Sequence, residues 1–244
     1  MNVLDHTLHR PYPLPSRRSF IKQYWSNLFF VHWPVSHDQI RQLVPKALEI
    51  DTYQGKAWIG IVHFILNGIF PKGRHNKSII PPFLELNIRT YVTYKGKPGV
   101  YFIRIHADSW LASKLAKVWY ALPYYYHPIS MVIDNMTFAL FVKNTNGFGN
   151  YKGIYTVEDY HFHPNEGDLE HWLTERYCLF NTNKNMTKIY CVNIHHLPWL
   201  LQPVTLKEWE NNLIHAQDFD FSAHPPLVHF SKRVEALIWN KVKT

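Results

Sequence analysis

The chain has 244 residues, of which 46% are hydrophobic and 18% charged, and this balance excludes an intrinsically disordered protein. This length suffices for one large core, so we expect a single domain over residues 20–244, preceded by an extended, proline-bearing segment over residues 1–19. The formal net charge is +8, but the basic residues are scattered singly or in pairs, which indicates a basic surface and argues against a nucleic-acid partner.

The first predicted element is a short helix over residues 37–44. Ser36 and Gln39 have the spacing of a capping box, and Pro45 ends the run. Residues 57–66 then carry Ile, Val, Phe and Trp in both alternating sets, which is typical of a strand covered on both faces.

A β-hairpin is predicted over residues 84–106, with its turn at residues 95–99. In its first strand, apolar and polar side chains alternate, so the strand has one apolar and one polar face. The apolar row is Leu86, Ile88, Thr90 and Val92, and the other row is Glu85, Asn87, Arg89 and Tyr91.

A second helix follows the hairpin, capped by Asp108 or Ser109 and stopped by Pro123. Lys114 and Lys117 are expected outside its apolar side. That side is predicted to consist of Leu111, Leu115, Val118, Trp119 and Leu122.

The remaining sequence alternates short strands with turns, of which Asn146-Gly147 is the clearest, and a short helix is expected over residues 207–216. Strands are predicted near residues 124–133, 136–143, 151–158, 173–180, 187–195 and 226–239. The sum is an α+β fold that is predominantly antiparallel β, without the strand-helix alternation of a doubly wound parallel sheet.

Cys178 and Cys191 lie in apolar stretches, where buried free thiols are the ordinary expectation. Two cysteines do not make a disulfide framework, which agrees with a reducing compartment. The most apolar windows are interrupted by polar residues, and no signal peptide is indicated. We therefore expect a cytoplasmic protein without a membrane partner.

Several motifs resemble known sequences. Residues 34–51, in which a helix ends in Val-Pro before Leu-Glu-Ile-Asp, resemble the N-terminal part of acetoacetate decarboxylases. The whole chain is similar to the YqjF-like family of uncharacterised bacterial proteins, a domain of unknown function in the same superfamily. The shared motifs are FVHWP (30–34), ELNIRTYV (85–92), PGVYF (98–102), LPYY (122–125), LEHWLTERY (169–177), HHLPW (195–199) and LVHFS (227–231). The resemblance implies a curved, barrel-like antiparallel sheet that encloses a pocket, with a few helices outside, and no known reaction.

In acetoacetate decarboxylases a lysine forms a Schiff base with the substrate ketone, and a second cation and desolvation lower its pKa. The resemblance aligns the family's pocket glutamate with Glu85 and its Pro-Lys-Lys motif with residues 123–125, where Tyr124 and Tyr125 replace both lysines. A phenol has no amine that condenses with a carbonyl, so imine chemistry at this position is excluded. The family's substrate-side arginine has no clear counterpart in this sequence. Arg89, on the same strand face as Glu85, can supply a cation in its place.

Two interpretations of these residues remain open. Glu85 and Arg89 share one face of a strand and either hold a polar ligand in a pocket wall or form a salt bridge on a solvated sheet. Tyr124, Tyr125 and His127 either orient a ligand and transfer protons, or pack as an aromatic strand in a core.

The histidines do not indicate a metal site. His171 and Glu175 share a face if their segment is helical, and His161 and His163 share a face in a strand, but no HExxH or cysteine pair accompanies them. At residues 195–196 two histidines follow one another in a strand, so one is expected near the pocket and the other at the surface.

The sequence thus predicts a small-molecule-binding pocket protein without a cofactor. Glu85 is the candidate catalytic group, and Arg89, Tyr124, Tyr125 and His127 are candidate ligand-binding groups. The alternative is an acid-base enzyme that acts on a carbonyl or enolisable compound without imine formation, with Glu85 as base and a tyrosine as acid or oxyanion donor. A protein-interaction module is a third class, because the chain is rich in aromatic residues, although these also fit an ordinary core. A homo-oligomer is compatible with each function.

Overall fold

The computed structural model describes residues 2–71, 73, 77–120, 122–143, 147, 149–183, 185, 187–213, 219 and 225–244. Its helices are the 3-10 turn η1 (Val3–Asp5), α1 (His37–Arg41), α2 (Trp110–Tyr120) and α3 (Leu169–Thr174). The strands are β1 (Ile21–Val35), β2 (Glu49–Ile50), β3 (Ala57–Pro71), β4 (Phe83–Tyr94), β5 (Lys97–Ala107), β6 (Tyr124–Tyr126), β7 (Ile129–Asp134), β8 (Thr137–Val142), β9 (Tyr151–Val157), β10 (Cys178–Thr182), β11 (Ile189–His195), β12 (Gln202–Asn211), β13 (Leu227–Ile238) and β14 (Val242–Lys243).

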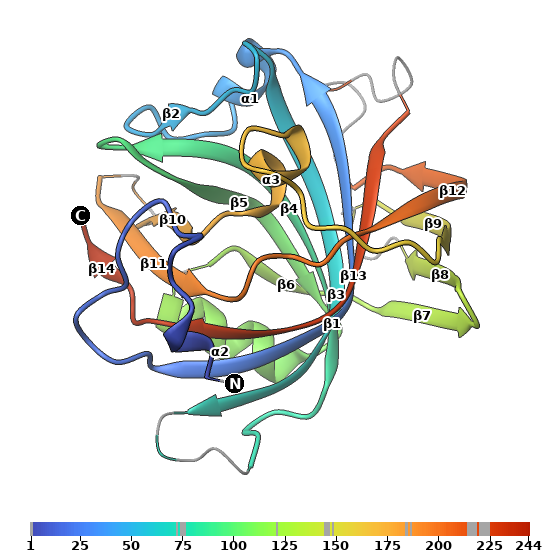
Figure 1. The fold of residues 1–244 in the computed structure, drawn as a ribbon, viewed down its shortest axis with the longest axis horizontal. Coiled ribbons are helices and arrows are strands. Elements are labelled where there is room, and N and C mark those ends of the chain that lie inside the picture. The colour runs from blue at the N-terminus through green and yellow to red at the C-terminus, as the bar shows by residue number, and fades with distance from the viewer. Residues whose placement is uncertain are drawn as a thin grey trace.

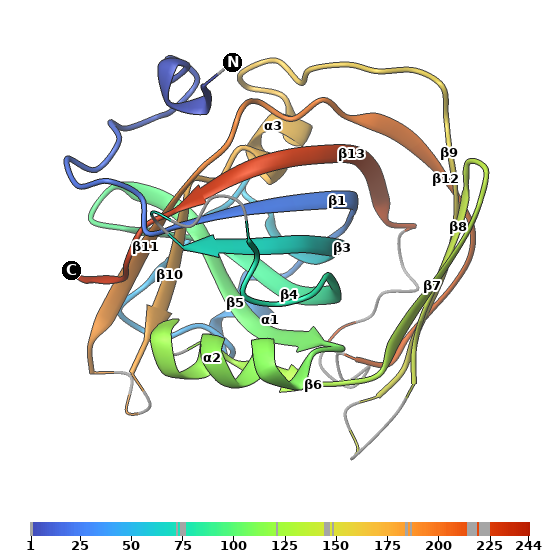
Figure 2. The same cartoon turned by 90° about the horizontal axis from the view of Figure 1, so that it is seen from below.

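The strands form one strongly curved sheet, and the predicted α+β, predominantly antiparallel class is confirmed. Strand β11 pairs with β10 and also with β13, so the path of paired strands returns on itself through β11, β10, β5, β4, β3, β1 and β13. We call these seven strands the ring. Strands β12, β9, β8 and β7 continue from β13 and form a second layer beside the ring (Figures 1 and 2). Among the described pairs, only β5 with β10 and β5 with β6 are parallel.

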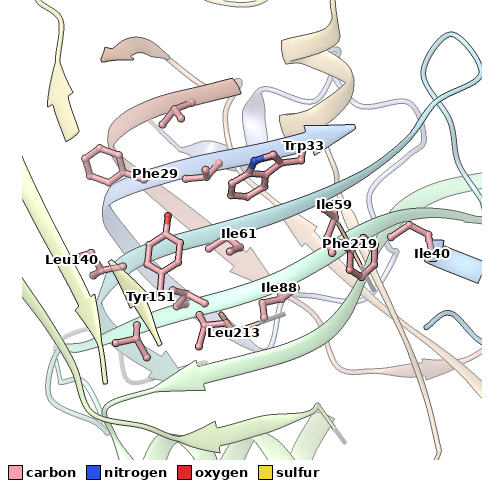
Figure 3. Packing of buried hydrophobic residues seen from close by; sticks show 14 of the residues in the cluster. Phe29, Trp33, Ile40, Ile59, Ile61, Ile88, Leu140, Tyr151, Leu213 and Phe219 are labelled. Atoms are coloured by element: carbon pink, nitrogen blue, oxygen red, sulfur yellow. The ribbon is translucent and has the colours of Figure 1, made fainter. Parts of the chain in front are cut away.

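Alternate residues of the ring strands belong to two apolar clusters. Ile61 of β3 and Ile88 of β4 pack in a first cluster with Leu140 and Tyr151 of the second layer (Figure 3). Val62, the next residue of β3, belongs to the second cluster, whose members include the lining of the ring interior. Strand β3 is therefore covered on both faces, as its sequence predicts.

The hairpin of β4 and β5 is confirmed, with Lys95 and Gly96 at φ values of 51° and 74° in its two-residue turn. The capping box of Ser36 and Gln39 is present at α1, which is shorter than the predicted helix over residues 37–44. Ser109 caps α2, accepting a hydrogen bond from the backbone of Ala112.

The predicted apolar side of α2 is partly wrong. Leu111 and Val118 are 45% and 68% exposed, whereas Ala112 and Tyr120 are buried. The helix packs against β5 and β6 along a stripe rotated from the predicted one.

Other differences concern elements that long-range pairing determines. Residues 21–35, for which no strand was predicted, form β1. Residues 207–211 belong to β12 and not to the predicted helix, because Trp209 packs on Trp33 with ring centroids 5.5 Å apart. The predicted helix continues into residues 214–216, which lie outside the described residues, as does Asn146 of the predicted turn.

Two predicted strands have different bounds. The strand expected near residues 173–180 begins only at Cys178, because α3 ends at Thr174. The strand expected near residues 124–133 is divided into β6 and β7. Within the described residues, no helix is long and apolar enough to cross a lipid bilayer.

Candidate functional site

A cavity of about 130 Å³ lies inside the ring, and all seven ring strands contribute to its lining. Helix α2 contributes Ala112, Leu115 and Ala116 to the lining. Most lining side chains are apolar, as expected for residues of a strand face that points away from solvent. The polar and charged lining groups are Gln23, Glu85, Asn87, Arg89, Tyr120, Tyr124, Thr174, Arg176 and His196.

Glu85 is a buried carboxyl group on the inner face of β4. Tyr124 of β6 donates a hydrogen bond of 2.7 Å to its Oε2, and the Asn87 amide lies 3.4 Å from its Oε1. Burial raises the pKa of Glu85 to about 7, against the lowering effect of these two hydrogen bonds. The carboxyl group is therefore divided between its neutral and charged forms near neutral pH.

Arg89 lies on the same strand face as Glu85 but forms no ion pair with it; among the described residues, no carboxylate is within 4.0 Å of its guanidinium. Its Nη2 donates to the carbonyl oxygen of Leu173 at 3.2 Å. Its Nε is buried and has no hydrogen-bond partner within the described part of the chain. The salt bridge on a solvated face, which the sequence left open, is not what the structure shows, because both side chains are buried.

Arg176 is a second guanidinium at the cavity, and no prediction from the sequence singled it out. Its Nη1 is held by Asp51 Oδ2 at 2.6 Å and its Nε by the carbonyl oxygen of Trp172 at 2.7 Å. Its Nη2 is buried, and no described residue is its hydrogen-bond partner. The partner Asp51 lies 125 positions away in the chain, so sequence spacing gives no signal for this pair.

Tyr125 and His127, two predicted ligand-binding residues, are not among the lining residues of the cavity. The ammonium group of Lys117 lies over the ring of Tyr125, 4.9 Å from the ring centroid. His127 is buried, with its Nδ1 3.0 Å from that of His106. Because side chains alternate along a strand, Tyr125 points away from the side that Tyr124 occupies.

No lysine is among the lining residues in the described part of the chain. Lys114 places its ammonium group 4.9 Å from the ring centroid of Trp110, which is exposed on α2, and Lys117 lies over Tyr125. Neither Lys114 nor Lys117 is a lining residue of the cavity.

The two consecutive histidines differ from the expectation in one respect. His196 lines the cavity, and burial lowers its pKa to about 3, so it is neutral there. The other histidine was expected at the surface, but His195 is buried because the N-terminal segment covers it: its Nε2 lies 2.9 Å from the carbonyl oxygen of Val3. In the described residues, no three His, Cys, Asp or Glu side chains gather in an arrangement suited to a metal ion.

The arrangement combines an apolar cavity, a titratable carboxyl group with a phenol donor, and two guanidinium groups that have unsatisfied N–H bonds. Such a site can hold an anionic group at the guanidiniums and move a proton at Glu85.

Comparisons with known proteins agree with this architecture. Residues 22–235 match the family DUF2071, described as an uncharacterized conserved protein. The chain is 37% identical over 223 residues to the uncharacterized protein YqjF of Bacillus subtilis (strain 168), and the match covers 90% of each chain.

Two solved structures are similar in fold. The acetoacetate decarboxylase from Legionella pneumophila subsp. pneumophila str. Philadelphia 1 has a TM-score of 0.63 at 14% identity, over 100% of this chain and 96% of that chain. The enduracididine biosynthesis enzyme MppR complexed with pyruvate has a TM-score of 0.62 at 14% identity, over 93% of this chain and 91% of that chain. The fold expected from the motifs is thereby confirmed.

Proposed function

Because the chain belongs to the DUF2071 family and has the acetoacetate decarboxylase-like fold, we propose that its cavity binds a small organic acid without forming a Schiff base. The ligand's anionic group lies at Arg89 and Arg176, and its apolar body fills the remaining cavity. Glu85 and Tyr124 then face the ligand from the same cavity wall.

The observation that carries this proposal is the pair of unsatisfied guanidinium nitrogens. Arg89 Nε and Arg176 Nη2 are both buried, and neither has a hydrogen-bond partner among the residues that the structure describes. A buried donor left unpaired costs about 1–3 kcal/mol, more for a charged group, and an anion accepting from both nitrogens removes this cost. Arg89 also lacks a carboxylate partner among the described residues, so it brings a positive charge that no protein group balances within ion-pair distance.

The size of the cavity limits the ligand. A cavity of about 150 Å³ holds a benzene ring, and the cavity here is about 130 Å³. Together with the mainly apolar lining, this favours a compact acid with a short branched or single-ring body. The structure of MppR is of a complex with pyruvate, and a ligand of this general size is what we propose for the present chain.

An enzymatic role is the second candidate, and the environment of Glu85 favours it. A general acid or base works best when its pKa lies near the working pH, and burial brings the pKa of Glu85 to about 7. Because the described lining residues include no lysine, the chemistry that we propose is proton transfer on a carbonyl or enolisable compound, with Tyr124 as donor to a developing oxyanion.

Calorimetric titration with benzoate, 2-methylpropanoate and uncharged benzyl alcohol tests the binding proposal. We expect the acids to bind and Arg89→Met to weaken that binding at least about tenfold. Arg233→Met, which removes an exposed arginine, serves as the matched control. Equal binding of benzoate and benzyl alcohol, or unchanged benzoate binding in the Arg89 variant, would refute the proposal.

The enzymatic role is tested with 2-oxo acids and ketones in heavy water. The measurement is deuterium exchange at the carbon next to the ketone carbonyl, which is C3 in a 2-oxo acid. Exchange that the wild-type protein accelerates and Glu85→Gln does not would support it. Acceleration that persists in Glu85→Gln removes Glu85 from the chemistry.

A further inference from the structure

The two cysteines lie together on the outer side of the cavity wall. Cys178 of β10 and Cys191 of β11 are buried, and their thiols are hydrogen-bonded to each other. In the register of this antiparallel pair, Cys178 lies opposite Asn193 and Cys191 opposite Phe180, so the cysteines are diagonal neighbours. The residues that follow each of them, Leu179 and Val192, face one another and line the cavity.

A cation is held against this pair of thiols. Lys97 Nζ lies 3.6 Å from Sγ of Cys191 and donates a 2.7 Å hydrogen bond to Asn193 Oδ1. Its ammonium group also lies 4.1 Å from the ring centroid of Tyr12. Among the described residues, no carboxylate is within 4.0 Å of Lys97 or of Arg10, which lies beside Tyr12. A thiolate at Cys191 would give Lys97 a negative partner.

The local electrostatics assign different roles to the two thiols. The hydrogen bond from Cys178, and after it the charge of Lys97, lower the pKa of Cys191 against the effect of burial. Burial raises the pKa of Cys178 and keeps that thiol protonated. The contact with Lys97 thus favours Cys191 as the thiolate, and Cys178, two register positions away on the neighbouring strand, is the protonated thiol beside it.

We propose that Cys191 is a peroxide-reactive thiolate and that Cys178 is its resolving partner. The Cys191 sulfur attacks a hydroperoxide: an S–O bond forms, the O–O bond breaks, and the leaving oxygen takes a proton and departs as water or an alcohol. Cys191 is oxidised to the sulfenic acid, and the peroxide is reduced. The Cys178 sulfur then attacks Sγ of Cys191, which forms the disulfide and releases the sulfenic oxygen, with the thiol proton, as water.

The position of the two cysteines gives a peroxide a route to Cys191 and links disulfide formation to the cavity wall. Lys97 is only partly buried and contacts Cys191 directly, so the thiol lies one side chain from solvent. Diagonal residues on neighbouring strands are about 7–8 Å apart, farther than the Cα atoms of most disulfides. Closing the bond therefore draws β10 and β11 together, and Leu179 and Val192 of the cavity wall move with them.

The test treats the folded protein with hydrogen peroxide and maps its thiols by mass spectrometry. We expect the wild-type protein to yield one cross-linked peptide joining Cys178 to Cys191, which a thiol reductant cleaves. In Cys178→Ser the sulfenic acid at Cys191 persists and is trapped by dimedone, whereas Cys191→Ser gives neither product. Absence of both disulfide and sulfenic acid in folded wild-type protein, under conditions that oxidise the unfolded chain, would overturn the proposal.

Lysine variants test whether Lys97 activates the Cys191 thiol or only lies beside it. Lys97→Met should slow alkylation of Cys191 by iodoacetamide about tenfold, the effect of one pKa unit, while Lys97→Arg should retain the wild-type rate. Lys95→Met removes an exposed lysine of the same hairpin and is the matched control. Equal rates in the wild-type, Lys97→Met and Lys95→Met proteins would show that Lys97 does not activate the thiol and would count against the assigned nucleophile.

Discussion

The hydroxyl group of Tyr124 on β6 donates a 2.7 Å hydrogen bond to the carboxyl group of Glu85 on β4, and both side chains are buried in the cavity wall. This bond favours the charged form of Glu85 and lowers its pKa. Tyr124→Phe should therefore raise the pKa of Glu85 above its value of about 7.

Carbon-13 NMR titration of the glutamate carboxyl groups, assigned with Glu85→Gln, measures this shift. Tyr125→Phe is the control, because Tyr125 is adjacent in sequence but does not line the cavity. A Glu85 pKa that falls, or that moves as far in the Tyr125 variant, would contradict the assigned hydrogen bond.

The raised pKa of Glu85 also makes the folded state less stable as the pH rises. Between about pH 4.5 and 7 the unfolded chain ionises this group while the folded protein keeps the proton, so stability is full below that range and lost through it. The whole effect is about 3 kcal/mol. Glu85→Gln has no such proton, and its urea-unfolding free energy relative to wild type should increase from pH 4.5 to 8. A difference that stays constant over this range would show that Glu85 is not held neutral by burial.

Loss of the Asp51 carboxylate should be costly because it leaves Arg176 without its ion-pair partner. The two side chains are 19% and 5% exposed, respectively. We expect Asp51→Asn to reduce the unfolding free energy by about 3 kcal/mol. Glu208→Gln breaks the Lys152–Glu208 pair, whose side chains are 32% and 55% exposed, and should cost no more than about 1 kcal/mol. Chemical denaturation at pH 7 measures the unfolding free energy of both variants. Similar losses of unfolding free energy would contradict the expectation that the buried ion pair contributes more than the exposed one.

His63 is expected to destabilise the protein in acid. Burial lowers its pKa from 6.5 to about 3, so the unfolded chain binds a proton that the folded protein rejects as the pH falls below 6.5. Its contribution to stability is thus present above pH 6.5 and lost towards pH 3. His63→Phe removes this titration but also the contact of His63 Nε2 with Tyr155 Oη at 3.2 Å. We expect the variant to be less stable than wild type at pH 7.5 and to lose less stability between pH 7 and 5. Parallel pH profiles of the two proteins would argue against a neutral, buried His63.

The sequence predicted the hairpin of β4 and β5 and the two faces of β4, because side-chain alternation and turn chemistry are local. It did not predict β1, whose residues pair with β3 and β13, or the strand at residues 207–211, where Trp209 packs on Trp33. In these segments the partner strand determines the conformation, and the partner is far away in the chain.

For the site, the sequence pattern brought Glu85 and Arg89 to one strand face, and the motif similarity added Tyr124. Both placements hold in the structure, whereas their roles remain proposals. The motif similarity also placed Tyr125 at the site, and His127 was grouped with the tyrosines because it is adjacent in sequence. However, β6 is a strand of three residues and its alternation points Tyr125 away. Arg176 follows α3 and is positioned by Asp51, a contact that no local pattern reveals.

The pairing of Ile21 with Ile238 joins β1 to β13, nearly the full length of the sequence apart. Contacts between such distant segments slow folding, because the chain must lose much of its freedom before these contacts can compensate. The hollow inside the ring is thus completed only when β13 docks. A compound that fits in this cavity binds the folded protein and not the unfolded chain. It should therefore stabilise the folded state and slow the loss of the β13 pairing.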